Sequence, residues 1–234
     1  MRIDDPAHDA RQYATEQNLE ARRSLYANAE GPDPREIAFE AVAEVGPKRV
    51  IEVGGGPGEL AARIGGELGC EVVMLDISPR MVELARKRGV DARVGDVQSL
   101  PFSEGTFDCA VAAWMLFHVP DVDAGLRELA RVLQHGGRLV ATTNSIDHLT
   151  ELREIAGTAR WKRVFTRENG AEIIGRHFDR VDRRDADGWV TIDDDKVVRG
   201  FVASLDTETP SVLPPYELPI RSRRASSVFV ATKT

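Results

Sequence analysis

The chain has 234 residues and a formal net charge of −7, and 42% of its residues are hydrophobic. This apolar content is enough for a folded core and excludes a disordered chain, a collagen or a coiled coil. Two cysteines are too few for a disulfide scaffold and do not suit a structural zinc site. The acidic balance disfavours nucleic acid as a partner, because phosphate backbones select basic surfaces.

The sequence predicts a protein of the cytoplasm rather than of a membrane. Its longest uncharged apolar stretch, residues 109–117, is much shorter than the roughly 20 residues of a membrane-spanning helix. The first residues lack the apolar segment of a secretory signal. A short basic stretch at residues 160–167 would suit RNA, but a solvated surface is the simpler interpretation.

The N-terminal part is predicted to be helical. Residues 7–29 are rich in Arg and Glu and have thinly spaced apolar positions, which is typical of amphipathic helices with a narrow apolar face. Asp33 and Pro34 then supply the cap and the first-turn proline of a further helix. We therefore expect an N-terminal helical cap or lid over residues 1–47.

From residue 49 onward, strands alternate with helices. The predicted strands are 50–53, 71–77, 92–94, 107–113 and 138–143, with helices over 60–68 and 78–89 and before Gly136. Alternation with short loops implies right-handed crossovers and a parallel sheet covered on both faces. The predicted fold class is α/β.

The last third is less regular. It predicts helices over 149–159, 167–178 and 193–205, one or two strands over 180–192, a loop over 210–219 and a final strand over 226–232. We expect one core over residues 48–234, with an insertion at about 145–178 that helps to cover the site.

A glycine-rich segment carries the strongest functional signal. Residues 50–60 read VIEVGGGPGEL and place Gly54, Gly56 and Gly58 between a strand and a helix. Glycine permits left-handed backbone and lets a ligand lie against the main chain. The segment therefore predicts a nucleotide-like cofactor at the edge of the sheet, and a turn without a ligand is the less favoured alternative.

The acidic residues of this segment restrict the cofactor. The dinucleotide fingerprint needs a glycine where Glu59 stands, and no lysine of a phosphate-binding loop follows. Glu52 and Glu59 would also repel a pyrophosphate. S-adenosylmethionine, which has an amine and a sulfonium but no phosphate, is the cofactor that tolerates them.

Several motifs together resemble one family. EVGGGPG is similar to the E/D-x-G-x-G-x-G motif of class I (Rossmann-like) S-adenosylmethionine-dependent methyltransferases. Further family elements follow in order: Asp76 after the second strand, Gly95-Asp96-Val97 after the third, and FDCAVAAWMLFHVPD with LRELARVLQHGGRLVATTN. The resemblance covers about residues 49–144 and is closest to the type 11 small-molecule branch. It implies a seven-stranded, mostly parallel sheet, with the last strand antiparallel beside the fifth.

The resemblance also implies roles for individual residues. Asp76 would accept hydrogen bonds from both ribose hydroxyls, although a helix cap is the alternative. Asp96 would accept from the adenine amine, or would merely form a turn, and Val97 would direct an N–H toward the ring. The carbonyl of Ala113 would hold the methionine amine, and Glu52 would orient the glycine loop.

Other predicted contacts have equally plain alternatives. Ile77 and Met81 would enclose the ribose or adenine, although Met81 equally suits the core. Tyr13 would close over the cofactor or simply pack. His118 is the candidate general base for a hydroxyl or ammonium acceptor, or a structural element beneath the cofactor. No catalytic metal is expected, because metal-dependent members carry acidic residues where this chain has Ala113-Trp114 and Thr143-Asn144-Ser145.

These observations predict an enzyme that moves a methyl group from S-adenosylmethionine to an O or N atom of a small molecule. The alternatives are a methyltransferase acting on RNA or protein, and a non-catalytic, cofactor-binding regulatory partner. A nicotinamide-dependent oxidoreductase is disfavoured by the missing glycine. A homodimer is left open.

Overall fold

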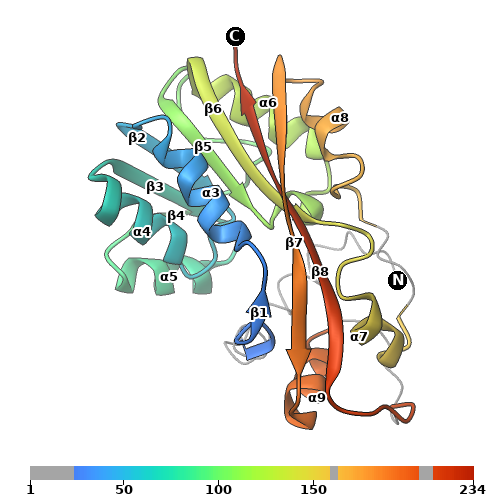
Figure 1. Ribbon diagram of the computed structural model, residues 1–234. Coiled ribbons are helices and arrows are strands. Elements are labelled where there is room, and N and C mark those ends of the chain that lie inside the picture. The colour runs from blue at the N-terminus through green and yellow to red at the C-terminus, as the bar shows by residue number, and fades with distance from the viewer. Residues whose placement is uncertain (1–23, 159–162, 206–212) are drawn as a thin grey trace.

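The computed structural model describes residues 24–158, 163–205 and 213–234. Its centre is an eight-stranded sheet of order β1-β7-β8-β6-β5-β2-β3-β4 (Figure 1). The strands are β1 (Ala29–Glu30), β2 (Arg49–Val53), β3 (Glu71–Asp76), β4 (Asp91–Val94), β5 (Phe107–Ala113), β6 (Leu133–Asn144), β7 (Arg180–Ile192) and β8 (Ile220–Thr232).

The predicted α/β class is confirmed, as is the arrangement of the last strand. Strands β2 to β6 pair in parallel, and β8 lies antiparallel to β6 from Arg138↔Thr232 to Asn144↔Ser226. The predicted count of seven strands was wrong by one. The additional strand, β1, pairs with β7 through two residues, which is too short a segment to show alternation in sequence.

Helices cover both faces of the sheet. On one face lie α3 (Pro34–Ala43), α4 (Glu59–Leu68) and α5 (Pro79–Lys87); on the other lie α6 (Val122–Val132) and α8 (Gly170–Ile174) (Figure 1). Two predicted helix starts are confirmed by their caps. The side chain of Asp33 accepts the N–H of Arg35, and that of Ser78 accepts the N–H of Met81.

Strands β7 and β8 continue beyond the end of β6 as a paired ribbon, to which β1 adds at Trp189 and Val190. They pair from Arg180↔Thr232 to Ile192↔Ile220, whereas β6 ends at Asn144, opposite Ser226. The distal ribbon carries α7 (Thr150–Ile155) and α9 (Asp195–Ser204) (Figure 1). These elements bury an apolar cluster of their own: Leu25, Leu149, Leu152, Ala156, Val190, Ile192, Val198, Phe201, Val202 and Ile220.

The helices of the two segments that were predicted to cover the site lie in different parts of the fold. Helix α3 of the N-terminal segment packs on the sheet, and α8 of the insertion packs on the opposite face, whereas α7 lies with the ribbon. The predicted helices at 149–159 and 167–178 were too long. The second is shortened because Asn169 accepts the N–H and hydroxyl of Thr166 in a turn. Their role as a lid stays a prediction.

No helix within the described ranges combines the length and the apolar character needed to cross a membrane. Nor do these ranges contain a group of three or more His, Cys, Asp or Glu residues placed to hold a metal ion.

Two adjacent buried threonines on β6 provide a matched test of the sheet. Among the described residues, the Thr142 hydroxyl has no hydrogen-bond partner, while the Thr143 hydroxyl donates to the Phe165 carbonyl at 3.2 Å. Thr142→Val should therefore raise the free energy of unfolding by about 1 kcal/mol, and Thr143→Val should lower it by a similar amount. Urea unfolding of both variants checks this. Equal destabilisation by the two would show that the Thr142 hydroxyl is paired.

Candidate functional site

The glycine loop joins β2 to α4 at the carboxyl ends of the parallel strands. Gly54 has φ 63°, and a Cβ there would lie 2.6 Å from the Cβ of Met115, so only glycine fits. Gly56 has φ 55°, and a Cβ there would meet nothing within 4 Å. Gly58 is the N-terminal cap of α4. The main chain at Gly56 therefore faces open space, as a ligand lying on the backbone requires.

Asp76 connects this loop to the start of α5. One carboxylate oxygen accepts the Gly56 N–H at 2.9 Å, and the other accepts the Ser78 N–H at 2.8 Å. Burial raises the pKa of Asp76, while these two N–H groups and the nearby His118 act to lower it. Each oxygen has a further lone pair, so the carboxylate can accept additional donors.

Glu52 lies behind the loop. Its side chain is 2% exposed, and a Cβ on Gly55 would approach its Cδ to 2.9 Å. Burial raises the pKa of Glu52 to about 8; a hydrogen bond with the Ala61 backbone opposes this shift, and the charge of Asp76 adds to it. The Glu52 side chain therefore lies against the back of the loop, and its role in orienting the loop stays a prediction.

Apolar side chains lie next to Asp76. Ile77 is 66% exposed and Val94 is 55% exposed, although both are large hydrophobic residues. Met81, in contrast, is 3% exposed. Of the two residues predicted to enclose the ribose or adenine, Ile77 is therefore the accessible one, and Met81 is packed in the interior.

The segment after β4 forms a turn. The Asp96 carboxylate accepts the Gln98 N–H at 2.9 Å and both its oxygens accept the Gln98 side-chain amide, while the Val97 side chain is buried. Within the protein, Asp96 therefore acts as a turn residue, which was the alternative to its predicted contact with adenine. Contacts of Asp96 and Val97 with adenine stay predictions.

His118 ends a short 3₁₀-helix, Leu116–His118, after β5. Its ring lies 4.5 Å from that of Phe117, centroid to centroid, and its charge lowers the pKa of Asp76. This position beside the acidic anchor favours the structural role over that of a general base, which stays a prediction. Tyr13 lies outside the described residues.

The ends of β5 and β6 show a strained residue and a polar network. Trp114 follows Ala113 with φ 54°, which is unusual for a bulky side chain and is often found at functional sites. The Trp114 backbone N–H donates to the Thr142 carbonyl at 2.9 Å, and its indole N–H donates to Asn144 Oδ1 at 3.1 Å. Sequence reasoning did not identify Asn144 as a site residue.

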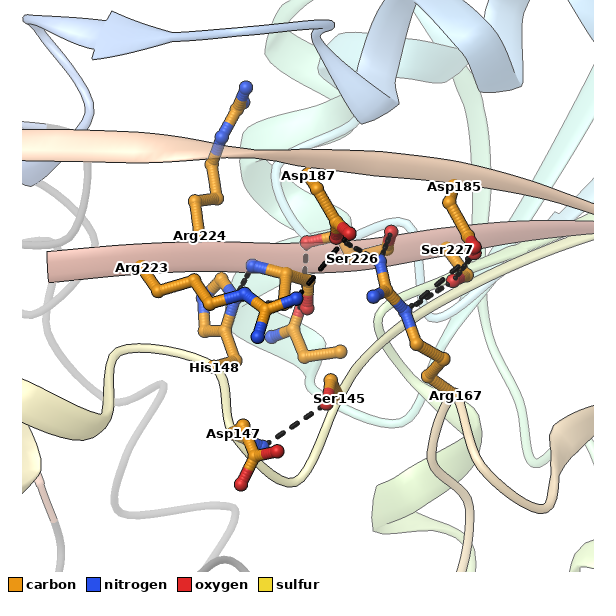
Figure 2. Close-up of polar contacts among 12 residues, drawn as sticks. Ser145, Asp147, His148, Arg167, Asp185, Asp187, Arg223, Arg224, Ser226 and Ser227 are labelled. Carbon is orange, nitrogen blue, oxygen red and sulfur yellow. Dashed lines mark hydrogen bonds and ion pairs between the residues drawn. The ribbon is translucent and has the colours of Figure 1, made fainter.

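Arg167 fastens the loop before α8 to the ribbon (Figure 2). Its guanidinium donates to the Ser227 hydroxyl, the Ser226 carbonyl and the Asp187 carboxylate, and its backbone N–H donates to the Asn144 carbonyl. These contacts join residues about twenty to sixty positions apart in the chain. No local sequence pattern could have indicated them.

The residues at the carboxyl ends of β2 and β3 fit an adenosyl cofactor. Open main chain at Gly56, free acceptor capacity on Asp76 and the exposed apolar side chain of Ile77 suit a sugar and a base. The Asp76 carboxylate disfavours phosphate and suits a cationic sulfonium. Open α/β sheets bind ligands at the carboxyl ends of the strands, at the point where the connections from two adjacent strands lead to opposite sides of the sheet.

Comparison with known proteins agrees with this geometry. Residues 51–141 match a family described as "Methyltransferase domain". The ubiquinone/menaquinone biosynthesis C-methyltransferase of Cellvibrio japonicus is 37% identical over 111 residues, which is 43% of this chain and 44% of that protein. The chain thus matches less than half the length of this relative.

Solved structures share the fold over nearly the whole chain. A Thermotoga maritima protein described as a SAM-dependent methyltransferase, possible histamine N-methyltransferase, has a TM-score of 0.60 and 21% identity, covering 95% of this chain and 98% of that one. The [4+2]-cyclase SpnF has a TM-score of 0.64 and 20% identity, covering 97% and 94%.

The fold and the site define a Rossmann-like, cofactor-binding α/β domain. Residues 51–141 match the methyltransferase-domain family, so the predicted resemblance to class I S-adenosylmethionine-dependent methyltransferases of type 11 is confirmed over this region, and the solved structures share the fold. S-adenosylmethionine is the cofactor of this class, as predicted from the glycine loop.

Two buried groups give the stability of the protein a defined pH dependence. Burial raises the pKa of Glu52 from 4.5 to about 8 in the folded state. Its contribution to the free energy of unfolding is therefore fully present below pH 4.5 and is lost as the pH rises toward 8. The pKa of His148 is lowered by burial from 6.5 to about 3, so its contribution is present above 6.5 and is lost as the pH falls. Of these two effects, that of Glu52 alone operates between pH 6.5 and pH 8.

Over that interval the free energy of unfolding should fall by on the order of 1 kcal/mol per pH unit, and Glu52→Gln should remove this slope. Urea unfolding at several pH values is the measurement, with the exposed Glu104→Gln as control. An unchanged slope in Glu52→Gln would contradict the assignment.

Proposed function

We propose that the protein transfers the methyl group of S-adenosylmethionine to an oxygen or nitrogen atom of a small molecule. The observation that carries the proposal is the open backbone at Gly56, tied at 2.9 Å to the buried carboxylate of Asp76. The net charge of −7 supports a small molecule rather than RNA as the acceptor.

When bound, the sulfonium supplies an already activated methyl group, so the protein contributes mainly alignment and exclusion of water. Asp76 would hold the ribose hydroxyls and Ile77 would cover the adenine. The Ala113 carbonyl, at the end of β5, would accept from the methionine amine. The acceptor would then lie beyond the ends of β5 and β6, beneath the distal ribbon.

Methyl transfer to carbon is a second candidate, because the Cellvibrio relative is described as a C-methyltransferase. The matched family region ends at residue 141, before the Asn144 network and the ribbon. Similarity over the cofactor-binding region therefore does not decide the acceptor atom. Incubation with methyl-deuterated S-adenosylmethionine and separate panels of phenols, amines and quinols, read by mass spectrometry, distinguishes transfer to oxygen, nitrogen and carbon.

Cofactor binding is tested by Asp76→Asn. This change removes the charge from hydrogen bonds to the ribose, so the affinity for S-adenosylmethionine should fall about ten-fold or more. Isothermal titration measures it. Asp91→Asn is the matched control, since Asp91 is an exposed aspartate at the other end of the strands, paired with Arg93 at 2.7 Å. Equal affinities in the two variants, or no binding by the wild type, would count against the proposed function.

A further inference from the structure

The side-chain amide of Asn144 has an orientation imposed by its neighbours. The indole N–H of Trp114 and the hydroxyl of Ser226 both approach Asn144 Oδ1, at 3.1 and 2.8 Å. An indole nitrogen can only donate, so the amide atom facing it must be the oxygen. The amide nitrogen Nδ2 is thereby directed away from both neighbours.

The backbone of Asn144 is equally fixed. It is the last residue of β6 and pairs with Ser226 of β8, and its carbonyl accepts the Arg167 N–H at 3.1 Å. Arg167 in turn donates to the Ser226 carbonyl, so one arginine fastens both strands at this point (Figure 2). Neither the main chain nor the side chain of Asn144 is left to rotate freely.

Two donor hydrogens on Asn144 remain unused. Within the described ranges no residue accepts a hydrogen bond from Nδ2, and Nδ2 is not among the buried polar atoms without a partner. The amide nitrogen is therefore open to a ligand. A pre-oriented donor pair of this kind favours a carbonyl or hydroxyl oxygen and gives little to an amine, because an ammonium has no lone pair and the lone pair of an aryl amine is delocalised into the ring.

The place of Asn144 in the sheet links this donor to the acceptor. It ends β6, next to β5, whose Ala113 precedes the strained Trp114, while Gly56 and Asp76 mark the cofactor side at β2 and β3. The Trp114 indole contacts the amide through its N–H at 3.1 Å and offers a flat surface suited to an aromatic ring.

We infer that Asn144, held in place by Trp114 and Ser226, recognises an aromatic methyl acceptor by donating a hydrogen bond to one of its oxygen atoms. The inference rests on the proposed function, because it requires an acceptor at this edge of the sheet. It makes Asn144 a specificity-determining residue, with Trp114 and Ser226 as the positioning residues that act through it.

The test measures binding of two aromatic probes to the full chain in the presence of S-adenosylhomocysteine. The probes are 1-naphthol and 1-naphthylamine, which carry oxygen or nitrogen at the same ring position. The wild type should bind the naphthol about ten-fold more tightly. Asn144→Asp keeps both acceptor contacts but has no N–H donor, so it should abolish this preference while leaving the affinity for S-adenosylhomocysteine unchanged.

Two further variants separate recognition from folding. Trp114→Phe removes the indole donor that orients the amide and should reduce the preference only in part. Thr142→Val, on the same strand, should leave it intact. Retention of the naphthol preference by Asn144→Asp overturns the inference, as does failure of the wild type to bind either probe while it binds S-adenosylhomocysteine. Failure to bind S-adenosylhomocysteine at all would instead overturn the proposed function.

Discussion

The site depends on one buried carboxylate. Asp76 holds the glycine loop through the Gly56 N–H and the start of α5 through the Ser78 N–H, and so fixes two connections that follow neighbouring strands. Both contacts have ordinary hydrogen-bond lengths, and both are made by a group that burial makes costly to ionise. Because the carboxylate accepts from the backbone on each side, its orientation is fixed, and each oxygen keeps a lone pair for a further donor.

Glu52 shows how two acidic side chains can share this interior. Burial raises its pKa to about 8, which keeps it largely protonated when Asp76 carries the charge. A neutral glutamate can pack behind the loop without adding to the repulsion at the site. The charge of Asp76 therefore remains to explain why a phosphate-bearing cofactor suits this loop poorly, while a cationic group next to it would be favoured.

The parts of the fold that sequence predicted well are those with local signals. The boundaries of β5 were predicted correctly, since its apolar run is continuous, and α5 begins at a hydroxyl cap followed by proline. Strand β1 and the full length of β8 were not predicted, because β1 depends on pairing with β7 about 160 residues away, and the distal half of β8 depends on pairing with β7 rather than on a local pattern. Likewise, Asp76 could be proposed from its place after a strand, whereas Asn144 depends on Trp114 and on Ser226, 82 positions away.

The β7–β8 ribbon has a mechanical consequence for the enzyme. Each strand runs for 13 residues without interruption, from the edge of the sheet to the overhanging half. Continuous hydrogen-bonded pairing along both strands leaves no hinge at the point where the ribbon leaves the sheet. If the acceptor lies beneath the ribbon, as proposed, the fit to acceptors of different shape depends on the side chains that the ribbon presents and not on a swing of the ribbon as a rigid arm.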